Sequence, residues 1–432
     1  MTERLVFRDL AGADRALTEN DRNWLQALAR DTDPANFVVG VGTSRIASAP
    51  EPVLHCDPDG NWRAGRYIGE LHRDGRVLEI RPRLGFTTIA AWAGAALNVR
   101  IVPRTGDHSR SSILIAELLA ATWRSTLVDA TRHGLPGFRA PQQHISPYVR
   151  GRLDLPSTMT LRTARSPHVA STSRPKQFDN PVSAVIVLAD RVLDRALRRK
   201  DWRGHRIDEV MPRLRAVTGP RPKLPTLREL RDVRYTPITL PYRRVAELSW
   251  QIARRNGLRA AATSERTTGL LIDVAELWEL FLLHCAKRAF GTANVTHGTR
   301  LTSTQYLLRT VADPMRTLGN MYPDLILGPP SRPWAIVDAK YKPLTDPRGV
   351  DREDLYQLHA YLSAHLERPL PAGALAYVDF PEPHIPARAE TMGPWKTSNG
   401  HQVRFQRLPI TENECVRAFQ QLIQLSLRDD HD

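Results

Sequence analysis

The sequence has little cysteine and no long hydrophobic run, and both shortages exclude classes of protein. Its 432 residues include three cysteines, Cys56, Cys285 and Cys415, which lie far apart. An odd and scattered set does not build a disulfide framework and suits a reducing compartment, so we expect a cytoplasmic location. No segment is long and apolar enough to predict a membrane span, and the first ten residues, MTERLVFRDL, do not resemble a secretory signal.

Several catalytic and nucleotide-binding motifs are also missing. The sequence contains no Cys-x-x-Cys or His-x-x-x-His spacing that would indicate zinc, and no Gly-x-Ser-x-Gly that would indicate a serine hydrolase. It also lacks the Gly-x-x-x-x-Gly-Lys-Ser/Thr phosphate loop. Any nucleotide hydrolysis associated with this chain must therefore come from another chain.

Positive charge is what the sequence has in excess. Lysine and arginine number 61 against 46 acidic residues, which gives a formal net charge of +15. Such an excess favours a polyanionic partner, nucleic acid above all. The alternative is that an arginine-rich composition gives a basic surface that is only solvated.

The length and the changes in composition predict an α+β protein of three domains, because 432 residues exceed one ordinary core. Residues 1–105 are predicted to be β-rich, with a hairpin that turns at Asp74-Gly75, a strong two-residue turn signal. Residues 106–264 are predicted to be mainly helical, with a basic and proline-rich loop between 201 and 240. Residues 265–432 form the last predicted domain.

The most informative stretch is a predicted hairpin whose apolar strands end in charged residues. Three apolar residues follow Asp324, and four precede Asp338-Ala339-Lys340, with a turn rich in glycine and proline between them. Residues two apart share a face of a strand, so Asp338 and Lys340 point the same way, and the hairpin brings Asp324 near them. Two carboxylates suit Mg²⁺, and Lys340 can orient a water molecule or stabilise charge on a phosphate.

A helix is predicted after this hairpin, with Asp351 as its cap. Gln357 and Tyr361 are four residues apart and therefore neighbours on one helical face, from which both can reach the hairpin charges. The apolar stripe of this helix is predicted to consist of Leu355, Leu358, Leu362 and Leu366.

In this order, three elements resemble the PD-(D/E)xK nuclease superfamily: Pro323-Asp324, Asp338-x-Lys340 at a strand end, and Gln357-x-x-x-Tyr361 on the next helix. The last element is similar to the RecB-type branch. The chain as a whole resembles McrC, the nuclease subunit of McrBC-type modification-dependent restriction systems, which act in antiviral defence. The stretches that carry this likeness are Leu78–Gly85, Arg150-Gly151-Arg152, Asp273–Phe281 and Pro323–Tyr361.

The resemblance implies a Mg²⁺-dependent endodeoxyribonuclease, with Mn²⁺ as a substitute, whose last domain is an α/β PD-(D/E)xK domain with a central mixed sheet. Asp324, Asp338 and the carbonyl of Ala339 would bind the metal. Lys340 would be the catalytic lysine, and Gln357 and Tyr361 would support the site or the substrate strand.

Glu279 lies on a predicted helix that begins near Asp273, at the border of the apolar stripe of that helix. It is either an ordinary surface residue or the acidic residue that this nuclease fold carries on the helix before its sheet. We favour the second interpretation, because an unpaired charge at such a border is costly.

The resemblance also implies partners. An AAA+ GTPase of the McrB type would dock on residues 1–105. This chain would stimulate nucleotide hydrolysis by that partner and would cut DNA together with it. Arg150 and Arg152 match a motif of the family and either contact phosphate or pair with Asp154 to hold their domain together. Two other functions stay open: a catalytically idle subunit that binds DNA or activates the AAA+ protein, and a metal-dependent RNA nuclease.

Overall fold

The computed structural model describes most of the chain, which forms two compact units. The described residues are 3–40, 51–97, 110–197, 201–254, 267–300, 305–313, 315–344, 349–381 and 392–428. One unit combines Met1–Leu118 with Ala260–Asp432, and the other is Leu119–Arg259. The first and third predicted domains thus lie in one unit, and the predicted middle domain nearly coincides with the other. The predicted mixture of helices and sheets is confirmed.

A five-stranded sheet in the first unit combines four early strands with one that comes much later in the sequence. The order is β1-β6-β5-β12-β2, with β12 antiparallel to β5. Asp74 and Gly75 both have positive φ, 50° and 74°, as the predicted two-residue turn between β5 and β6 requires. The strands are β1 (Glu3–Arg8), β2 (Val38–Val39), β5 (Tyr67–Arg73), β6 (Arg76–Arg81) and β12 (Thr268–Asp273).

Helix α1 (Glu19–Asp31) packs on this sheet because three apolar residues share one of its faces. Thr18 and Asp21 form a capping box that satisfies the first backbone N–H groups of the helix. Trp24, Leu25 and Leu28 are buried against the apolar strand residues. The remaining elements of this part are α2 (Pro34–Phe37), β3 (Leu54–Cys56), β4 (Trp62–Ala64) and α3 (Gly85–Leu97).

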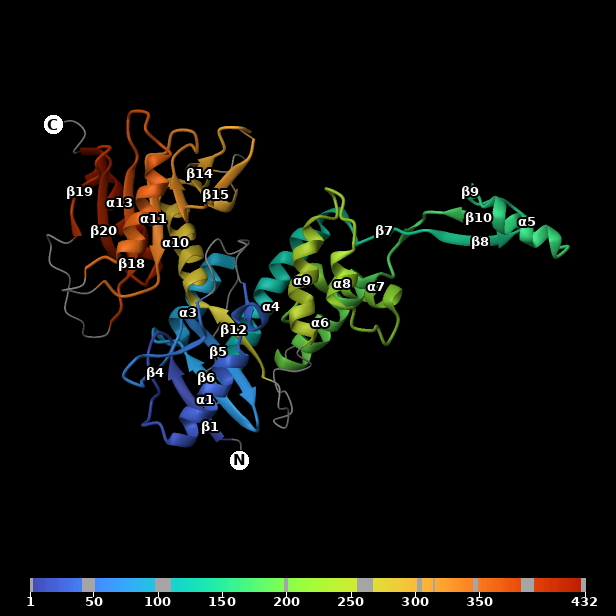
Figure 1. Ribbon diagram of the computed structural model, residues 1–432, viewed down its shortest axis with the longest axis horizontal. Coiled ribbons are helices and arrows are strands. Elements are labelled where there is room, and N and C mark those ends of the chain that lie inside the picture. Colours follow the sequence, from blue (N-terminus) through green and yellow to red (C-terminus); the bar gives the residue numbers. More distant parts are fainter. Residues whose placement is uncertain are drawn as a thin grey trace. The chain divides into compact units, whose positions relative to one another are not determined.

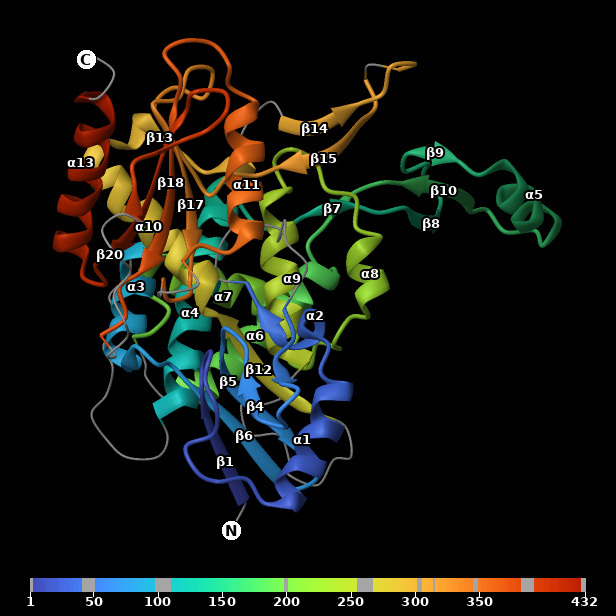
Figure 2. The ribbon, with the colours of Figure 1, turned by 60° about the vertical axis from the view of Figure 1, so that its left-hand side comes forward.

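A six-stranded mixed sheet carries the predicted site. Its order is β13-β16-β17-β18-β20-β19, and β17, β18 and β20 are parallel. Helices α10 and α13 cover one face, and α11 covers the other (Figure 2). The strands are β13 (Val295–Thr296), β16 (Leu325–Leu327), β17 (Ala335–Lys340), β18 (Ala372–Val378), β19 (Trp395–Lys396) and β20 (Gln402–Leu408). The helices are α10 (Val274–Phe290), α11 (Arg352–Ser363), α13 (Glu412–Arg428), η2 (Thr292–Asn294) and η3 (Gly298–Arg300).

Helix α10 connects the two sheets of the first unit directly. Asp273 is both the last residue of β12 and the N-cap of α10, where its carboxylate accepts hydrogen bonds from the first N–H groups of the helix. Trp92 of α3 stacks against Phe281 with 5.3 Å between ring centroids and lies 4.9 Å from Trp278. Helix α10 is therefore joined to the five-stranded sheet by the chain at Asp273 and packs on α3 through aromatic rings.

The second unit is mainly helical, as predicted. Buried faces of α6 and α9 pack together, and Trp123 donates a hydrogen bond to the Ser249 hydroxyl at 2.8 Å. The predicted basic, proline-rich loop between 201 and 240 is not continuous, because two helices interrupt it and leave 219–226 and 232–240 as the longer non-helical segments. The helices are α4 (Arg110–Ala130, which begins in the first unit), η1 (Thr131–His133), α6 (Pro181–Leu197), α7 (His205–Thr218), α8 (Leu227–Arg231) and α9 (Pro241–Arg254).

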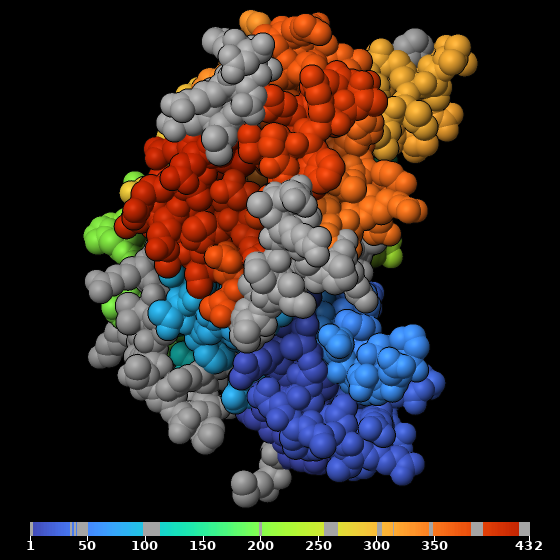
Figure 3. Space-filling model, turned by 90° about the vertical axis from the view of Figure 1, so that its left-hand side faces the viewer, coloured from blue at the N-terminus to red at the C-terminus, as the bar shows by residue number. Residues whose placement is uncertain are grey.

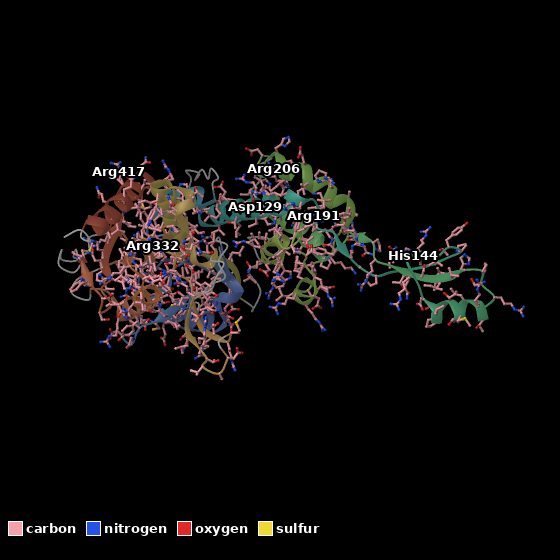
Figure 4. The ribbon with its side chains drawn as sticks, turned by 90° about the horizontal axis from the view of Figure 1, so that it is seen from above. Asp129, His144, Arg191, Arg206, Arg332 and Arg417 are labelled. Carbon is pink, nitrogen blue, oxygen red and sulfur yellow. The ribbon has the colours of Figure 1, made fainter. Side chains whose placement is uncertain are left out.

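An arm extends from these helices, a feature that the sequence did not predict (Figure 1). Its side chains stand along a narrow strand pair, with His144 near the outer sheet (Figure 4), where its ring contacts the Ser173 hydroxyl at 2.8 Å. At the base of the arm, β7 pairs with β11. The outer part of the arm is a three-stranded sheet in the order β8-β10-β9. The elements are β7 (Phe138–Arg139), β8 (Gln142–Ser146), β9 (Arg152–Leu153), α5 (Leu155–Thr163), β10 (Val169–Ser173) and β11 (Lys176–Gln177).

A separate two-stranded ribbon precedes β16. Strands β14 (Gln305–Arg309) and β15 (Thr317–Met321) pair only with each other among the described strands. They extend side by side away from β17 and α11 (Figure 2). None of the helices in the described ranges is both long and apolar enough to cross a membrane.

Candidate active site

The hairpin β16–β17 brings the two predicted metal-binding aspartates together. Leu325 pairs with Val337, and one step further along the same register Asp324 stands opposite Asp338. The backbone N–H of Ala339 donates a hydrogen bond to Asp324 Oδ2 at 2.7 Å, which fixes that carboxylate against β17. Asp338 is only 1% exposed, whereas Asp324 keeps partial access to solvent.

Lys340 and two side chains of α11 complete this cluster. Lys340 Nζ lies 2.5 Å from Asp338 Oδ2 and donates a hydrogen bond to Gln357 Oε1 at 2.8 Å. Gln357 Nε2 donates in turn to the Tyr361 hydroxyl at 2.8 Å, and this hydroxyl donates to the carbonyl of Tyr322 at 3.4 Å. The spacing of Gln357 and Tyr361 on one helical face, as predicted, connects the helix to the hairpin.

Glu279 faces the same cluster from α10, and His297 holds it there. Glu279 Oε1 is hydrogen-bonded to His297 Nε2. The backbone N–H of Thr299 donates to His297 Nδ1 at 3.2 Å, so Nδ1 is an acceptor and the ring donates through Nε2. This tautomer fixes the orientation of the Glu279 carboxylate, which is therefore not an ordinary surface group.

The carboxylates of this cluster have raised pKa values. Burial raises the pKa of Glu279 to about 8, and neighbouring carboxylates add to the effect. Burial likewise raises the pKa of Asp324, with further contributions from Glu279 and Asp338. Burial raises the pKa of Asp338 as well, against the opposing effect of Lys340. Burial alone would lower the pKa of Lys340, but Asp338 and Asp354 raise it above its ordinary value.

The donor set fits a divalent cation that prefers oxygen ligands. Asp338 Oδ1 is buried without a hydrogen-bond donor among the described residues, and such an atom requires a partner. A cation favours the ionised forms of carboxylates that otherwise repel each other. No three His, Cys, Asp or Glu side chains in the described part of the chain converge as a ready-made metal cluster. The protein would thus contribute two carboxylates and leave the other positions to a backbone carbonyl, water or substrate.

Asp354 is a buried member of the cluster that the sequence reasoning missed. Its Oδ1 lies 3.6 Å from Lys340 Nζ, and its Oδ2 lies 2.8 Å from Lys342 Nζ and accepts a hydrogen bond from the Tyr377 hydroxyl at 3.2 Å. Asp354 precedes Leu358 by one helical step of four, so the buried stripe of α11 contains it. That spacing was the available signal. His297 lies in a short connection without such periodicity, and no signal identified it.

The apolar stripe predicted for α11 is wrong in two residues, whereas the predicted cap position is confirmed. Leu355 and Leu366 are 38% and 62% exposed, and the buried face consists of Asp354, Leu358, Tyr361 and Leu362. Asp351 occupies the N-cap position but makes no side-chain hydrogen bond to the helix, because its carboxylate pairs with Lys342.

A buried hydrogen bond ties the site to the five-stranded sheet. Tyr341, the residue after Lys340, donates from its hydroxyl to Asp9 Oδ2 at 2.6 Å. Asp9 follows β1, is fully buried and also accepts a hydrogen bond from the backbone N–H of Arg83. The Tyr341 ring packs edge-on against Phe380 with centroids 5.5 Å apart. Strand β17 is thereby fixed at the end that carries Lys340.

A family model places this chain among known proteins. The model for the McrBC 5-methylcytosine restriction system component matches residues 62–372, which is most of the chain. The chain belongs to this family. The matched segment includes Glu279, Asp324, Asp338, Lys340 and the two residues of α11, so the resemblance inferred from the motifs is confirmed at the level of the family.

Two solved structures of family assemblies are similar to this chain. A chain of the tetradecameric assembly of Thermococcus gammatolerans McrB AAA+ hexamers with bound McrC is 15% identical, with a TM-score of 0.45, over 87% of this chain and 85% of that chain. A chain of the Thermococcus gammatolerans McrBC complex is 14% identical, with a TM-score of 0.38, over 66% of this chain and 88% of that chain. No curated protein matches.

The family match also includes Arg150 and Arg152, which lie on the arm, in the second unit. Both side chains are exposed. Asp154 caps α5 instead, accepting hydrogen bonds from the backbone N–H and hydroxyl of Ser157 at 3.2 and 2.7 Å. Among the described contacts no ion pair joins Asp154 to either arginine, so the interpretation of these residues as an internal clamp is wrong.

Proposed function

We propose that this chain is the endodeoxyribonuclease subunit of its restriction system, with a metal-dependent active site of the PD-(D/E)xK type. The observation that carries the proposal is the pairing of Asp324 and Asp338 on one hairpin, with Lys340 2.5 Å from Asp338 and Glu279 of α10 close enough to raise the pKa of Asp324. A purely structural hairpin has no reason to bury adjacent carboxylates, because each raises the cost of ionising the others.

Asp324, Asp338 and the carbonyl of Ala339 would hold Mg²⁺, or Mn²⁺ as a substitute. When bound, such an ion polarises a phosphate oxygen and lowers the pKa of a water molecule. The protein prepares this site in advance: the N–H of Ala339 orients Asp324, and the orphan Oδ1 of Asp338 remains available.

Lys340 is the group that acts on the phosphate or on the attacking water. Its ammonium stays protonated, because Asp338 and Asp354 stabilise the charge, so it stabilises the negative charge that develops on the phosphate. Gln357 positions it by accepting a hydrogen bond, and Tyr361 positions Gln357. Glu279, oriented by His297, assists as an acidic group next to the metal ligands.

DNA and an AAA+ GTPase of the McrB type are the proposed partners. The absence of a phosphate loop requires a separate motor. Exposed Arg150 and Arg152 on the arm suit phosphate contacts. Residues 1–105 remain the proposed docking region for the motor, which this chain would stimulate. Deleting residues 1–105 would remove β5, the pairing partner of β12, and unfold the first unit. Docking must therefore be tested in the full chain.

The docking test compares exposed residues of α1 with exposed residues of the arm. Arg22→Glu with Arg30→Glu changes the charge of α1 on its solvent side, and Tyr148→Ser removes an arm side chain that is 76% exposed. We expect the α1 variant to stimulate nucleotide hydrolysis by the AAA+ protein less than the wild type does. Loss only in the arm variant would assign docking to the arm.

The nuclease proposal is tested with the wild-type chain, its AAA+ partner and nucleotide. We expect modified plasmid DNA to be cut with Mg²⁺, EDTA to stop cutting, and Mn²⁺ to restore it. RNA of the same sequence is the comparison substrate. Cutting of RNA alone would establish the RNA nuclease, and stimulation of the motor without any cutting would establish the idle subunit.

A further inference from the structure

The ribbon β14–β15 exposes apolar side chains where a solvated hairpin would expose polar ones. Val311 is fully exposed, Met315 is 89% exposed, and Leu308 and Leu318, which stand opposite each other, are 61% and 68% exposed. Leu307 adds a fifth exposed apolar side chain. Figure 3 shows this part, in amber at the upper right, standing out from the surface. An exposed apolar patch of this kind marks a contact site.

The tip of the ribbon is structured by its own hydrogen bonds. The Thr310 hydroxyl donates to the carbonyl of Asp313 at 2.8 Å and accepts from the N–H of Asp313 at 3.1 Å. The Asp313 carboxylate accepts from the N–H of Met315 at 3.0 Å. These bonds order the described residues beside Val311 and Met315, which reduces the entropy that binding would cost.

The base of the ribbon is fixed beside the carboxylate cluster. Gln305 Nε2 lies 2.7 Å from His365 Nε2, just beyond the end of α11. At the other strand, only Tyr322 and Pro323 separate β15 from Asp324. The ribbon therefore extends from the immediate neighbourhood of Asp324, and its tip lies about one strand length from the site.

The charge of the ribbon favours an anionic partner. Arg309 and Arg316 lie at its tip end, and the Arg309 guanidinium stands 4.9 Å from the centroid of the Tyr306 ring. The one carboxylate, Asp313, is used in the turn. Basic side chains that flank an apolar tip suit a DNA duplex, because guanidinium groups contact phosphates while apolar side chains contact base edges.

We propose that the β14–β15 ribbon is a DNA-contacting element that enters a groove of the duplex and holds it beside Asp324 and Asp338. A two-stranded β-ribbon is one of the two elements that the major groove accommodates. Strands of this length reach about 16 Å, which exceeds the groove depth of roughly 8.5 Å. The inference rests on the proposed function, because it requires DNA at the carboxylate cluster.

The first test identifies the occupant by photo-cross-linking in the assembled complex. A benzophenone amino acid replaces Val311 in the full chain, with Ile238, an exposed apolar residue of the second unit, as the matched control position. The complex contains the AAA+ partner, nucleotide, duplex DNA and EDTA. We expect a DNA adduct from position 311 and none from 238. An adduct with the AAA+ subunit or with a second copy of this chain, or no adduct at 311, overturns the inference.

The second test measures DNA affinity in the same complex. Val311→Ser with Met315→Ser should weaken binding about tenfold, an effect of the size expected for one good groove contact. Arg316→Gln should reduce the slope of log affinity against log salt by about 1, and Arg206→Gln on α7 (Figure 4), which removes the same charge elsewhere, should not. Unchanged affinity in the tip variant overturns the inference. The nuclease proposal would survive that result if the wild type still cuts.

Discussion

Two consecutive hairpins of this chain depart from the usual distribution of side chains in opposite ways. Hairpin β16–β17 buries Asp338 at 1% exposure beside Asp324, whereas ribbon β14–β15 leaves Val311 fully exposed. A buried charge and an exposed apolar patch are the informative exceptions in a folded protein, because each costs stability. Our two proposals assign both costs to function: the buried hairpin would perform the chemistry, and the exposed ribbon would hold the substrate.

The largest expected effect is a difference in cleavage rate between substitutions of two lysines near the end of the buried hairpin. Lys340→Ala should lower the cleavage rate by a factor on the order of 10² or more, the usual scale for a positioned electrostatic group. Lys342 pairs with Asp351 and Asp354 and makes no described contact with Asp338, so Lys342→Ala should change the rate only a few-fold. Rates are measured on modified plasmid DNA with the motor present. Equal losses in both variants would contradict a specific role for Lys340.

The second effect contrasts the stability that leucines contribute in the two hairpins. Leu327 of β16 is fully buried and Leu308 of the ribbon is 61% exposed. Leu327→Ala should lower the free energy of unfolding by about 2–5 kcal/mol, and Leu308→Ala by less than about 0.5 kcal/mol. Both residues lie in the first unit, so urea unfolding followed by tryptophan fluorescence compares them directly. A large loss from Leu308→Ala would show that the ribbon is structural.

A smaller effect tests how the buried hairpin is fixed. Tyr341→Phe removes the hydroxyl that donates to Asp9, and it should destabilise the first unit by about 1–3 kcal/mol, since a buried carboxylate loses a donor. Adding Asp9→Asn should recover part of this loss, because an amide is less costly to bury than a charge. The pair is measured as a double-mutant cycle in urea. Strict additivity would mean that the two groups do not interact.

Local patterns predicted the hairpin and the helix that carry the candidate site, but they did not predict pairings between distant residues. The apolar runs on either side of a turn predicted the hairpin, and a spacing of four placed Gln357 and Tyr361 on one face. Asp354 was missed because the apolar stripe was assigned to Leu355 instead. The pairing of β12 with β5 and the bond from Tyr341 to Asp9 join residues about 200 and 332 positions apart, which no local period encodes.

The strands of the arm could not be predicted from the sequence either. Its strands are short and polar, so they lack the alternation of apolar and polar residues that predicts a strand. The exposure of the apolar residues in the ribbon could not be predicted from the sequence either, because a leucine in a strand pattern normally predicts burial. Burial, rather than pattern, distinguishes the two hairpins.

The most direct test of the active-site assignment is plasmid cleavage by Asp338→Ala with the AAA+ partner and nucleotide present. In the proposed function, removing this carboxylate takes away a metal ligand that no neighbour replaces. It should not unfold the chain, because it also relieves repulsion with Asp324 in the metal-free state. We expect a variant that is folded by circular dichroism, still stimulates the motor and does not cut modified DNA. A folded variant that cuts at the wild-type rate would contradict the placement of the active site at β16–β17.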